Sequence, residues 1–198
     1  MAPAGVLRVL IVDDSEERVA ILREGLERAG HHVAAVLSAP FDLLRAVETT
    51  RPDVIVIDTE SPSRDVLENL FAVTRSNPRP IVMFSEDRAS ASIREAVRAG
   101  VSAYVVDGLD ASRVEPILEV AVARFEEFQN LREQLAEATL KLEERKLVER
   151  AKGLLMKARG LDEDAAYKLL RQQAMQQQLR LGEVAERLIA AADLLAKG

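Results

Sequence analysis

The first half of the chain alternates between two patterns of apolar residues. Short runs rich in valine and isoleucine, bounded by Gly, Pro and Asp, are typical of buried parallel strands. Between them apolar residues recur every three or four positions, as in Glu16–Arg28, where Val19, Leu22 and Leu26 share one side of a helix. The strand candidates are RVLIVDD, HHVAAVL, DVIVIDT, PIVMFSE and SAYVVDG. This alternation predicts an α/β domain over residues 6–111, a five-stranded, doubly wound parallel sheet with helices on both faces.

A single long helix is predicted to follow this domain over residues 112–145. Ser112 and Glu115 match a capping box, Pro116 falls in the first turn, and no strong breaker follows for about forty residues. Side chains spaced alternately by four and three form a coiled-coil seam, with Arg124 as its one polar member. The seam consists of Ile117, Ala121, Arg124, Phe128, Leu131, Leu135, Ala138 and Leu142.

This seam predicts a partner helix. Its first two turns can pack on their own domain, and the whole stripe could in principle do so. A monomer, however, offers no obvious surface to bury the later positions. We therefore expect a homodimer, formed when the protein is active, whose seam is made by Phe128, Leu131, Leu135 and Leu142.

The remaining residues, 146–195, are predicted to form a small three-helix module. It comprises the end of the long helix through Met156, a second helix that starts near Asp162, and a third over about 181–195. Gly153 inside the first piece is expected to allow close approach of another backbone. The expected core is Leu154, Leu155, Met156, Tyr167, Leu169, Leu170, Val184, Leu188 and Ile189.

Composition narrows the class of protein. The 198 residues contain no cysteine and only two histidines, His31 and His32, which excludes disulfides, cysteine-ligated metal sites and histidine-rich metal sites. No apolar run approaches the roughly 18 residues needed to cross a bilayer, and no basic region precedes an apolar stretch at the N-terminus. We therefore expect a cytoplasmic protein without a membrane partner.

Charge is divided unevenly along the chain. Residues 1–145 contain 17 Lys and Arg against 26 Asp and Glu, whereas residues 146–198 contain 10 against 7. The net charges are therefore −9 and +3. A basic tail on an acidic protein is what a nucleic-acid-binding module would look like, although charge alone fits a solvated helical surface equally well.

Three carboxylates stand at the ends of two predicted strands. Asp13 and Asp14 close the first strand and Asp58 closes the third. In an open parallel sheet, functional groups gather at the carboxyl ends of the strands. A lone acid there is usually a turn residue or a helix cap, but three together provide the hard oxygen ligands that Mg²⁺ prefers. We therefore predict a Mg²⁺ site formed by Asp13, Asp14 and Asp58.

Over residues 6–125 the chain resembles the response-regulator receiver domain, whose fold is flavodoxin-like. The resemblance rests on LIVDD, on VIVID ending in Asp58, on Ser85 at the end of the fourth strand, and on Tyr104 in the fifth. It implies that Asp58 accepts a phosphoryl group, that the two acids of LIVDD hold Mg²⁺, and that Ser85 and Tyr104 occupy switch positions. Receivers normally have a lysine where this chain has Asp107.

The exchange of lysine for Asp107 changes the charge expected beside the phosphoryl group. At about 6 Å and an effective dielectric near 20, a lysine would contribute roughly 3 kcal/mol of attraction, and a carboxylate would reverse the sign. We therefore expect phosphorylation of Asp58 to be inefficient or absent. The acid cluster is then a structural or cation site, and a protein partner supplies the signal.

Residues 136–195 resemble the ANTAR domain of transcription antiterminators. The resemblance rests on the motif AKGLLM, followed by an Ala-Tyr pair at 166–167 and a Leu-Arg pair at 170–171. Together with an atypical receiver ending in YVVDGL, it points to the NasT type of nitrate-assimilation regulator. The resemblance implies binding to a leader RNA with paired hairpins, so that a terminator cannot form, and control by a nitrate-sensing inhibitory partner protein.

The side chains expected to bind this RNA are cations and amides near the motif. Hairpin loops are the accessible target, because side chains cannot read the deep major groove of A-form RNA. Lys152 and Arg171 are the first choices, since they lie inside the motif. The full set is Lys146, Arg150, Lys152 and Lys157 on the long helix and Lys168, Arg171, Gln172 and Gln173 on the second.

Two other functions stay open at this point. A phosphorylation-activated DNA-binding response regulator would prefer duplex DNA to RNA. A pure interaction protein would dock a partner through the acidic domain and the long helix, and its tail would only cap the dimer. Enzymatic activity is not expected, because the sequence has no phosphate-binding glycine loop and no serine or cysteine nucleophile beside a histidine.

Overall fold

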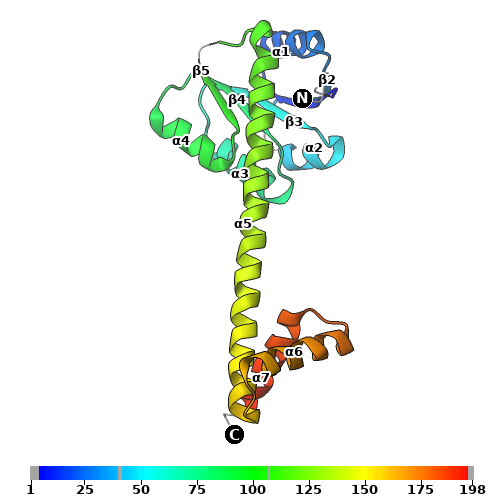
Figure 1. Ribbon diagram of the computed structural model, residues 1–198. Coiled ribbons are helices and arrows are strands. Elements are labelled where there is room, and N and C mark those ends of the chain that lie inside the picture. The colour runs from blue at the N-terminus through cyan, green and yellow to red at the C-terminus, as the bar shows by residue number, and fades with distance from the viewer. Residues whose placement is uncertain (1–4, 40–41, 107, 196–198) are drawn as a thin grey trace. The chain divides into compact units, whose positions relative to one another are not determined.

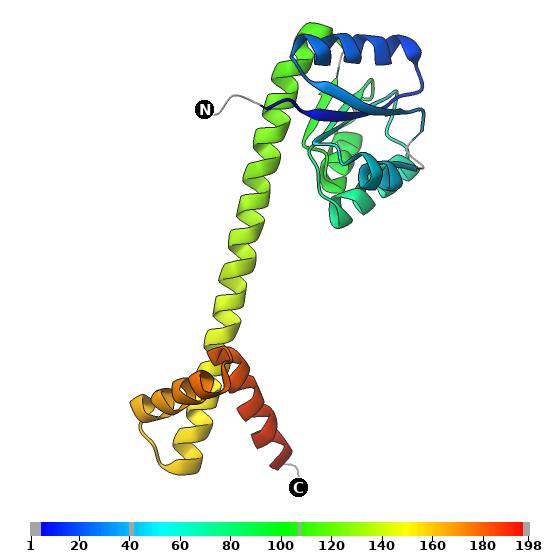
Figure 2. The same cartoon turned by 90° about the vertical axis from the view of Figure 1, so that its right-hand side faces the viewer.

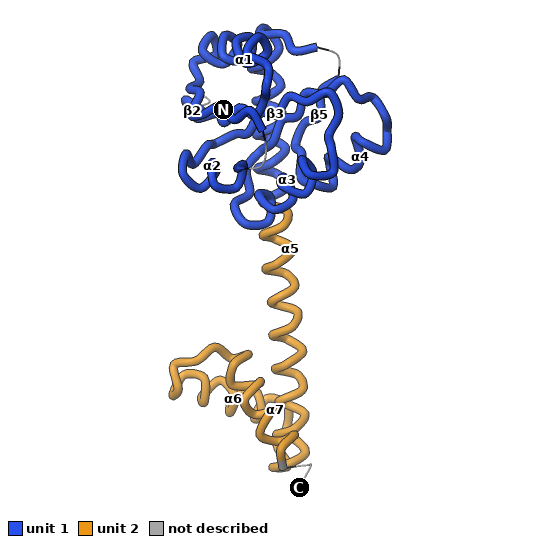
Figure 3. The backbone as a smooth tube through the Cα atoms, turned by 180° about the vertical axis from the view of Figure 1, so that it is seen from behind, with its two compact units in different colours: residues 1–129 blue, residues 130–198 orange. Residues whose placement is uncertain are grey.

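The computed structural model describes residues 5–39, 42–106 and 108–195. It divides into two compact units, residues 1–129 and residues 130–198, which Figure 3 shows in different colours. Unit 1 contains the sheet with helices α1 to α4, and unit 2 contains helices α6 and α7. Helix α5, Ala111–Arg159, contributes residues to both units. No helix in the described part of the chain is long and apolar enough to span a membrane.

Unit 1 is built on a five-stranded parallel sheet (Figure 1). The strand order is β2-β1-β3-β4-β5, so the chain reverses its direction across the sheet between β1 and β3. The predicted α/β fold with five parallel strands is confirmed. The strands are β1 Arg8–Val12, β2 His32–Leu37, β3 Val54–Thr59, β4 Ile81–Ser85 and β5 Ala103–Val106.

Helices cover both faces of the sheet (Figure 2). Alternate residues of a strand point to opposite faces, so Leu10 and Val12 lie in the core formed with α2, α3 and α4. Val9 and Ile11 lie in the core formed with α1 and the start of α5. Burial on both faces explains why the strands read as continuous apolar runs. These helices are α1 Glu16–Arg28, α2 Leu43–Thr50, α3 Arg64–Ser76 and α4 Ser90–Ala99.

The start of α5 differs from the capping-box prediction. The helix begins at Ala111, so Ser112 lies inside it. Asp110 precedes the helix, and its carboxylate accepts hydrogen bonds from the backbone N–H of Ser112 at 2.8 Å and from its hydroxyl at 2.7 Å. Asp110 therefore caps the N-terminus of α5. Pro116 is the sixth residue of the helix, in its second turn, where its missing N–H cannot donate to the carbonyl of Ser112.

The first turns of α5 pack on unit 1. Val114, Leu118 and Ala121 are buried in the core beside α1. Gly25 of α1 allows this close approach, because a Cβ there would lie 2.7 Å from the carbonyl oxygen of Ala111. Of the predicted seam, Ala121 is buried in this core and Ile117 is partly buried against it, so these early positions are used within the domain.

Unit 2 joins the end of α5 to α6, Glu163–Gln177, and α7, Leu181–Leu195. The carboxylate of Asp162 caps α6 by accepting a hydrogen bond from the N–H of Ala165 at 2.7 Å. These helices start where the sequence predicts, and the long helix ends three residues later than expected.

The core of unit 2 differs in its members from the one that the sequence predicts. Met156 and Tyr167, both expected inside, are 38% and 42% exposed. Gly153 is exposed, and apart from its chain neighbours and the backbone of its own helix no described atom lies within 4 Å of the position that a Cβ would take. The expected close approach at this glycine is therefore not made by this chain itself. The buried core consists of Val148, Ala151, Leu155, Ala166, Leu170, Ala174, Val184, Ala185 and Ile189.

Candidate functional site

The acidic residues predicted at the strand ends lie together in unit 1. Because β1 pairs with β3 in parallel, Asp13 and Asp14, directly after β1, stand beside Asp58, the fifth residue of β3. The side chain of Asp13 is fully buried and that of Asp58 is 12% exposed, whereas that of Asp14 is 79% exposed. The carboxylates thus meet at the point where the strand order reverses.

Arg18, which no sequence motif singled out, reaches all three carboxylates. Its guanidinium donates to both oxygens of Asp13, at 2.7 and 3.1 Å, and to Asp14 at 3.0 Å. Its Nε lies 3.7 Å from Oδ2 of Asp58. Arg18 sits in the first turn of α1, whose N-cap is Ser15, so the strand–helix junction itself positions it. Arg18 follows Asp14 by four residues across the predicted start of the helix, and this spacing was the available signal.

The environment of Asp58 disfavours its charged form. Burial and, to a lesser extent, the charge of Asp13 raise the pKa of Asp58 to about 6, although Arg18 opposes both. Asp13, Asp14 and Asp58 are the residues that would hold Mg²⁺, but their oxygens are engaged by a guanidinium. Among the described residues, no group of three or more acidic or histidine side chains has the arrangement of a metal site.

The predicted switch residues are joined through the loop after β4. The N–H of Asp87 donates to Oγ of Ser85 at 3.2 Å, and the hydroxyl of Tyr104 donates to the carbonyl of Asp87 at 2.8 Å. Oγ of Ser85 also donates to the carbonyl of Glu60, beyond β3, at 3.0 Å. Ser85 and Tyr104 therefore hold the same loop, and Asp87 is the link that the sequence did not reveal. Asp107 lies outside the described residues.

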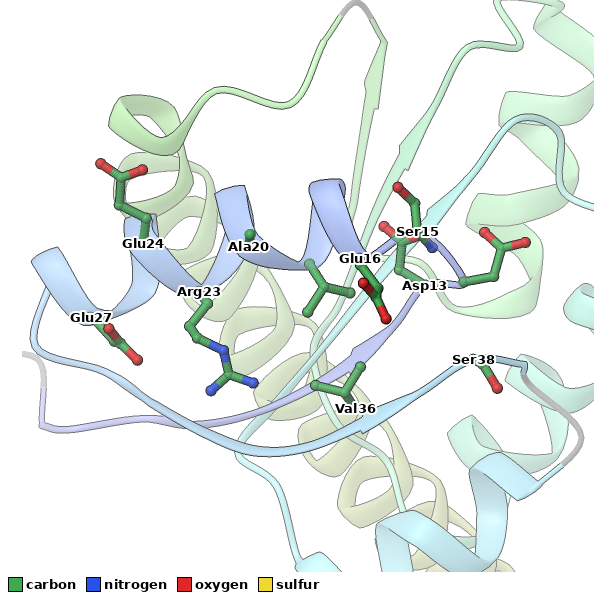
Figure 4. Close-up of a pocket in the computed structure, with 11 residues that line it drawn as sticks. Asp13, Ser15, Glu16, Ala20, Arg23, Glu24, Glu27, Val36 and Ser38 are labelled. Atoms are coloured by element: carbon green, nitrogen blue, oxygen red, sulfur yellow. The ribbon is translucent and has the colours of Figure 1, made fainter.

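A cleft of about 650 Å³ lies between α1 and β2 beside the acid pair (Figure 4). Three glutamates and one arginine of α1 line it, so its wall is acidic. Asp13 and Asp14 form the end of this lining that is nearest to Asp58 in the sheet. Its lining residues are Asp13, Asp14, Ser15, Glu16, Val19, Ala20, Arg23, Glu24, Glu27, Val36 and Ser38.

Lys152, a first choice for RNA contact, is buried in unit 2. It is 7% exposed, and its Nζ lies 2.8 Å from Glu149 and 2.7 Å from Glu163. Hydrogen bonds to these two carboxylates raise the pKa of Lys152. Because Glu163 opens α6, the lysine ties α5 to the start of α6. The motif predicts that Lys152 contacts RNA, whereas in the structure its ammonium is buried against two carboxylates.

Two further candidates on α5 are exposed but paired. Nζ of Lys146 lies 2.7 Å from Glu143 on the same helix. The guanidinium of Arg150 donates to both oxygens of Asp193 on α7, at 2.9 and 3.0 Å. Such pairs at the surface are weak and can be exchanged for phosphate.

The other candidates form an exposed group on the end of α5 and on α6. Lys157, Lys168 and Arg171 are exposed, and no described acidic residue forms an ion pair with them. Gln172 is also exposed, and the half-buried Gln173 exchanges hydrogen bonds with other glutamines of α6.

A second cleft, of about 360 Å³, lies between the three helices of unit 2. Five of its lining residues are apolar, and the other four are two arginines and two glutamines. The lining residues are Leu155, Arg159, Leu169, Leu170, Gln173, Gln177, Val184, Arg187 and Leu188.

The later seam positions of α5 are solvent-exposed. Phe128, Leu131, Leu135 and Leu142 are 57%, 53%, 69% and 54% exposed. Every residue over 130–146 is exposed or half-buried, so this part of the helix has little packing from its own chain.

Comparison with known families fits both units. The response regulator receiver domain matches residues 9–119, and the ANTAR domain matches residues 133–189. The chain belongs to the response regulators that carry an ANTAR domain. The transcriptional regulatory protein PdtaR of Mycobacterium tuberculosis is 32% identical to it over 179 residues, which cover 90% of this chain and 87% of that protein.

Other relatives match this ANTAR response regulator only in its receiver domain. The chemotaxis protein CheY of Thermotoga maritima is 26% identical over 108 residues, 54% of this chain and 90% of that protein. A LuxR-family response regulator structure from Aurantimonas is 26% identical, with a TM-score of 0.53 over 60% of this chain and 86% of that one.

Proposed function

We propose that this ANTAR response regulator binds a leader RNA with paired hairpins through unit 2 and acts as a transcription antiterminator. The observation that carries the proposal is the ANTAR match over residues 133–189. Within it, three cations on α5 and α6 are exposed and pair with no described acidic residue. RNA backbone attracts such cations, and each phosphate contact releases counterions. Binding of the hairpins stabilises them, so that a terminator cannot form and transcription continues. The cations are Lys157, Lys168 and Arg171.

The second cleft and Gly153 support a loop-binding surface. The bases of a hairpin loop are splayed out and can enter a cleft. The apolar lining residues can contact one such base, and Arg159 and Arg187 in the same lining can bind its flanking phosphate. Gly153 lies on α5 between Arg150 and Lys157, at helical spacings of three and four. An exposed helix-interior glycine exposes its own backbone, so a phosphodiester chain can come closer there than beside any other residue.

The proposal includes a homodimer in the active state. The exposed seam Phe128, Leu131, Leu135 and Leu142 has the a/d spacing of a two-stranded coiled coil. Two copies joined through this seam present two RNA-binding units, one for each hairpin of the pair. The second hairpin then binds at a high effective concentration.

The narrower proposal concerns the operon and its control. The resemblance of the receiver ending YVVDGL to the NasT type supports a nitrate or nitrite assimilation operon as the target. A nitrate-sensing partner protein holds the regulator inactive and releases it when nitrate or nitrite is present. Control by a partner suits a receiver whose Asp58 is held by Arg18 and whose lysine position is Asp107.

Removing a cation of the exposed group is expected to weaken RNA binding and lower its salt dependence. For Lys168→Ala and Arg171→Ala, the slope of log affinity against log salt should fall by about 0.7 to 0.9 for each phosphate that the variant no longer neutralises. The measurement is a titration of the full chain against a two-hairpin leader RNA, a scrambled RNA and duplex DNA at several salt concentrations. Preference for duplex DNA would instead support a DNA-binding regulator.

Lys152→Gln is the matched control for this experiment. Because its ammonium is held by Glu149 and Glu163, we expect the variant to lower the melting temperature of unit 2 without changing the salt slope. A reduced slope in Lys152→Gln, or unchanged binding in the Lys168 and Arg171 variants, would contradict the proposed surface.

Gly153→Ala is expected to stabilise the protein and weaken its binding to RNA. Alanine in a helix interior is favoured over glycine by up to about 1 kcal/mol, and the space around Gly153 is open. The added methyl group keeps the RNA backbone away, so affinity should fall about tenfold, which corresponds to about 1.4 kcal/mol of binding free energy. Urea unfolding and the same RNA titration measure the two effects. Equal or tighter RNA binding would rule out backbone approach at this position.

A further inference from the structure

The acid cluster of the receiver domain already contains a cation that belongs to the chain. Arg18 makes two hydrogen bonds to Asp13 and one to Asp14, and its Nε lies 3.7 Å from Asp58. These are the same three carboxylates that would bind Mg²⁺. One side chain therefore contacts the whole set of expected metal ligands.

The guanidinium is firmly held and permanently charged. A bidentate contact between arginine and a carboxylate is stronger than a single ion pair, and Asp13 offers both of its oxygens from a buried position. Oδ1 of Asp13 also accepts the N–H of Ser15 at 2.8 Å, which fixes the orientation of the carboxylate. The hydrogen bond to Asp13 raises the pKa of Arg18, so the positive charge persists at every physiological pH.

A divalent cation cannot share this site with Arg18. Mg²⁺ demands octahedral geometry with oxygens at about 2.0 to 2.1 Å, and it keeps several waters of its own. The oxygens of Asp13 that would face the metal are directed to the guanidinium. A metal would also lie within a few ångströms of the arginine charge, which repels it. Mg²⁺ and the observed position of Arg18 therefore exclude one another.

We propose that Arg18 is a built-in substitute for the divalent cation of the receiver domain. It keeps the carboxylates of Asp13, Asp14 and Asp58 together without metal, and Mg²⁺ binds only when the guanidinium leaves. The affinity of the receiver for Mg²⁺ is therefore set by Arg18. This inference concerns unit 1 and is independent of the proposed RNA binding in unit 2.

The test is a calorimetric titration of Mg²⁺ into the full chain and its Arg18→Gln variant. Removal of the competing charge is expected to tighten Mg²⁺ binding at least about tenfold. Arg23→Gln is the control, because Arg23 lies on the same helix beside the same cleft, and the variant loses the same charge. The affinity of Arg23→Gln for Mg²⁺ should stay within about twofold of that of the original chain. Equal or weaker Mg²⁺ binding by folded Arg18→Gln would overturn the proposal.

A second measurement needs no variant, in case Arg18→Gln does not fold. The NMR signal of the Arg18 Nε–Hε group reports its hydrogen bond to Asp13 in the original chain. On titration with Mg²⁺ this signal should move to the position of a solvent-exposed arginine, in step with metal binding. A signal that stays in place while Mg²⁺ binds would show that both cations fit, which would also overturn the proposal.

Discussion

Leu135→Glu is expected to dissociate the proposed dimer into monomers at micromolar concentration. Leu135 is 69% exposed in the chain by itself and occupies a seam position of α5. In a two-stranded coiled coil such a side chain is buried, which contributes about 1.5 to 3 kcal/mol per leucine. A symmetric dimer loses two leucines and gains two facing carboxylates. The dissociation constant should therefore rise at least about 100-fold.

Leu140→Glu is the matched control for the dimer. Leu140 is 71% exposed on the same helix, but it lies five residues after Leu135, on the side away from the seam. Analytical ultracentrifugation over a range of concentrations should show dimers for the original chain and for Leu140→Glu. A monomeric original chain, or equal disruption by both substitutions, would contradict the seam.

The dimer prediction also has a consequence for RNA binding. Leu135 is not part of the core of unit 2, so the affinity of Leu135→Glu for an RNA with one hairpin should match that of the original chain. Its affinity for the paired hairpins should fall by about 100-fold or more, because the second hairpin no longer benefits from a high effective concentration. This comparison separates loss of avidity from damage to the RNA-binding surface.

Asp58→Asn is expected to stabilise the receiver domain at pH 7.5 by about 2 to 3 kcal/mol. The folded-state pKa of Asp58 is about 6, against an ordinary value of 3.8. Each pKa unit corresponds to about 1.4 kcal/mol. An acid with a raised pKa holds its proton more tightly in the folded state, so it costs no stability below pH 3.8. The loss of folding stability caused by ionised Asp58 grows as the pH rises and is complete above about pH 6.

The gain from Asp58→Asn should therefore depend on pH. It should be close to zero near pH 4 and reach its full value above pH 6.5, as measured by urea unfolding in EDTA so that no metal stabilises Asp58. Asp42→Asn is the control, because Asp42 is exposed and makes no capping hydrogen bond to α2. A variant less stable than the original chain at pH 7.5 would show that Asp58 makes a favourable charged contact in the folded state.

The sequence allowed the receiver fold and its acid cluster to be predicted because both follow from local patterns. Apolar runs identify buried strands, and the rule for open parallel sheets places Asp13 and Asp58 at one edge. The ANTAR motif likewise identified unit 2 from a short stretch of residues. These features could be predicted because they depend on residues close together in the sequence and on a sheet topology that has few alternatives.

The direction of individual side chains could not be predicted in this way. Lys152 lies in the motif, yet its ammonium is buried between two glutamates, one of which opens the next helix. Met156 and Tyr167 have the right residue types for a core, but they lie on the outer side of their helices. A small core has room for few side chains, and the packing angle of three helices decides which ones.

The sequence by itself determined the fold class, the family resemblance, the acid cluster and the exposed seam of α5. Only the tertiary structure revealed that Arg18 occupies the acid cluster, that Asp87 joins Ser85 to Tyr104, and which cations remain exposed. Secondary structure follows from short-range periodicity, whereas an ion pair requires that two side chains meet in space with the right orientation. That meeting depends on how helices and strands pack, because a shift of one helical residue turns its side chain by about 100°.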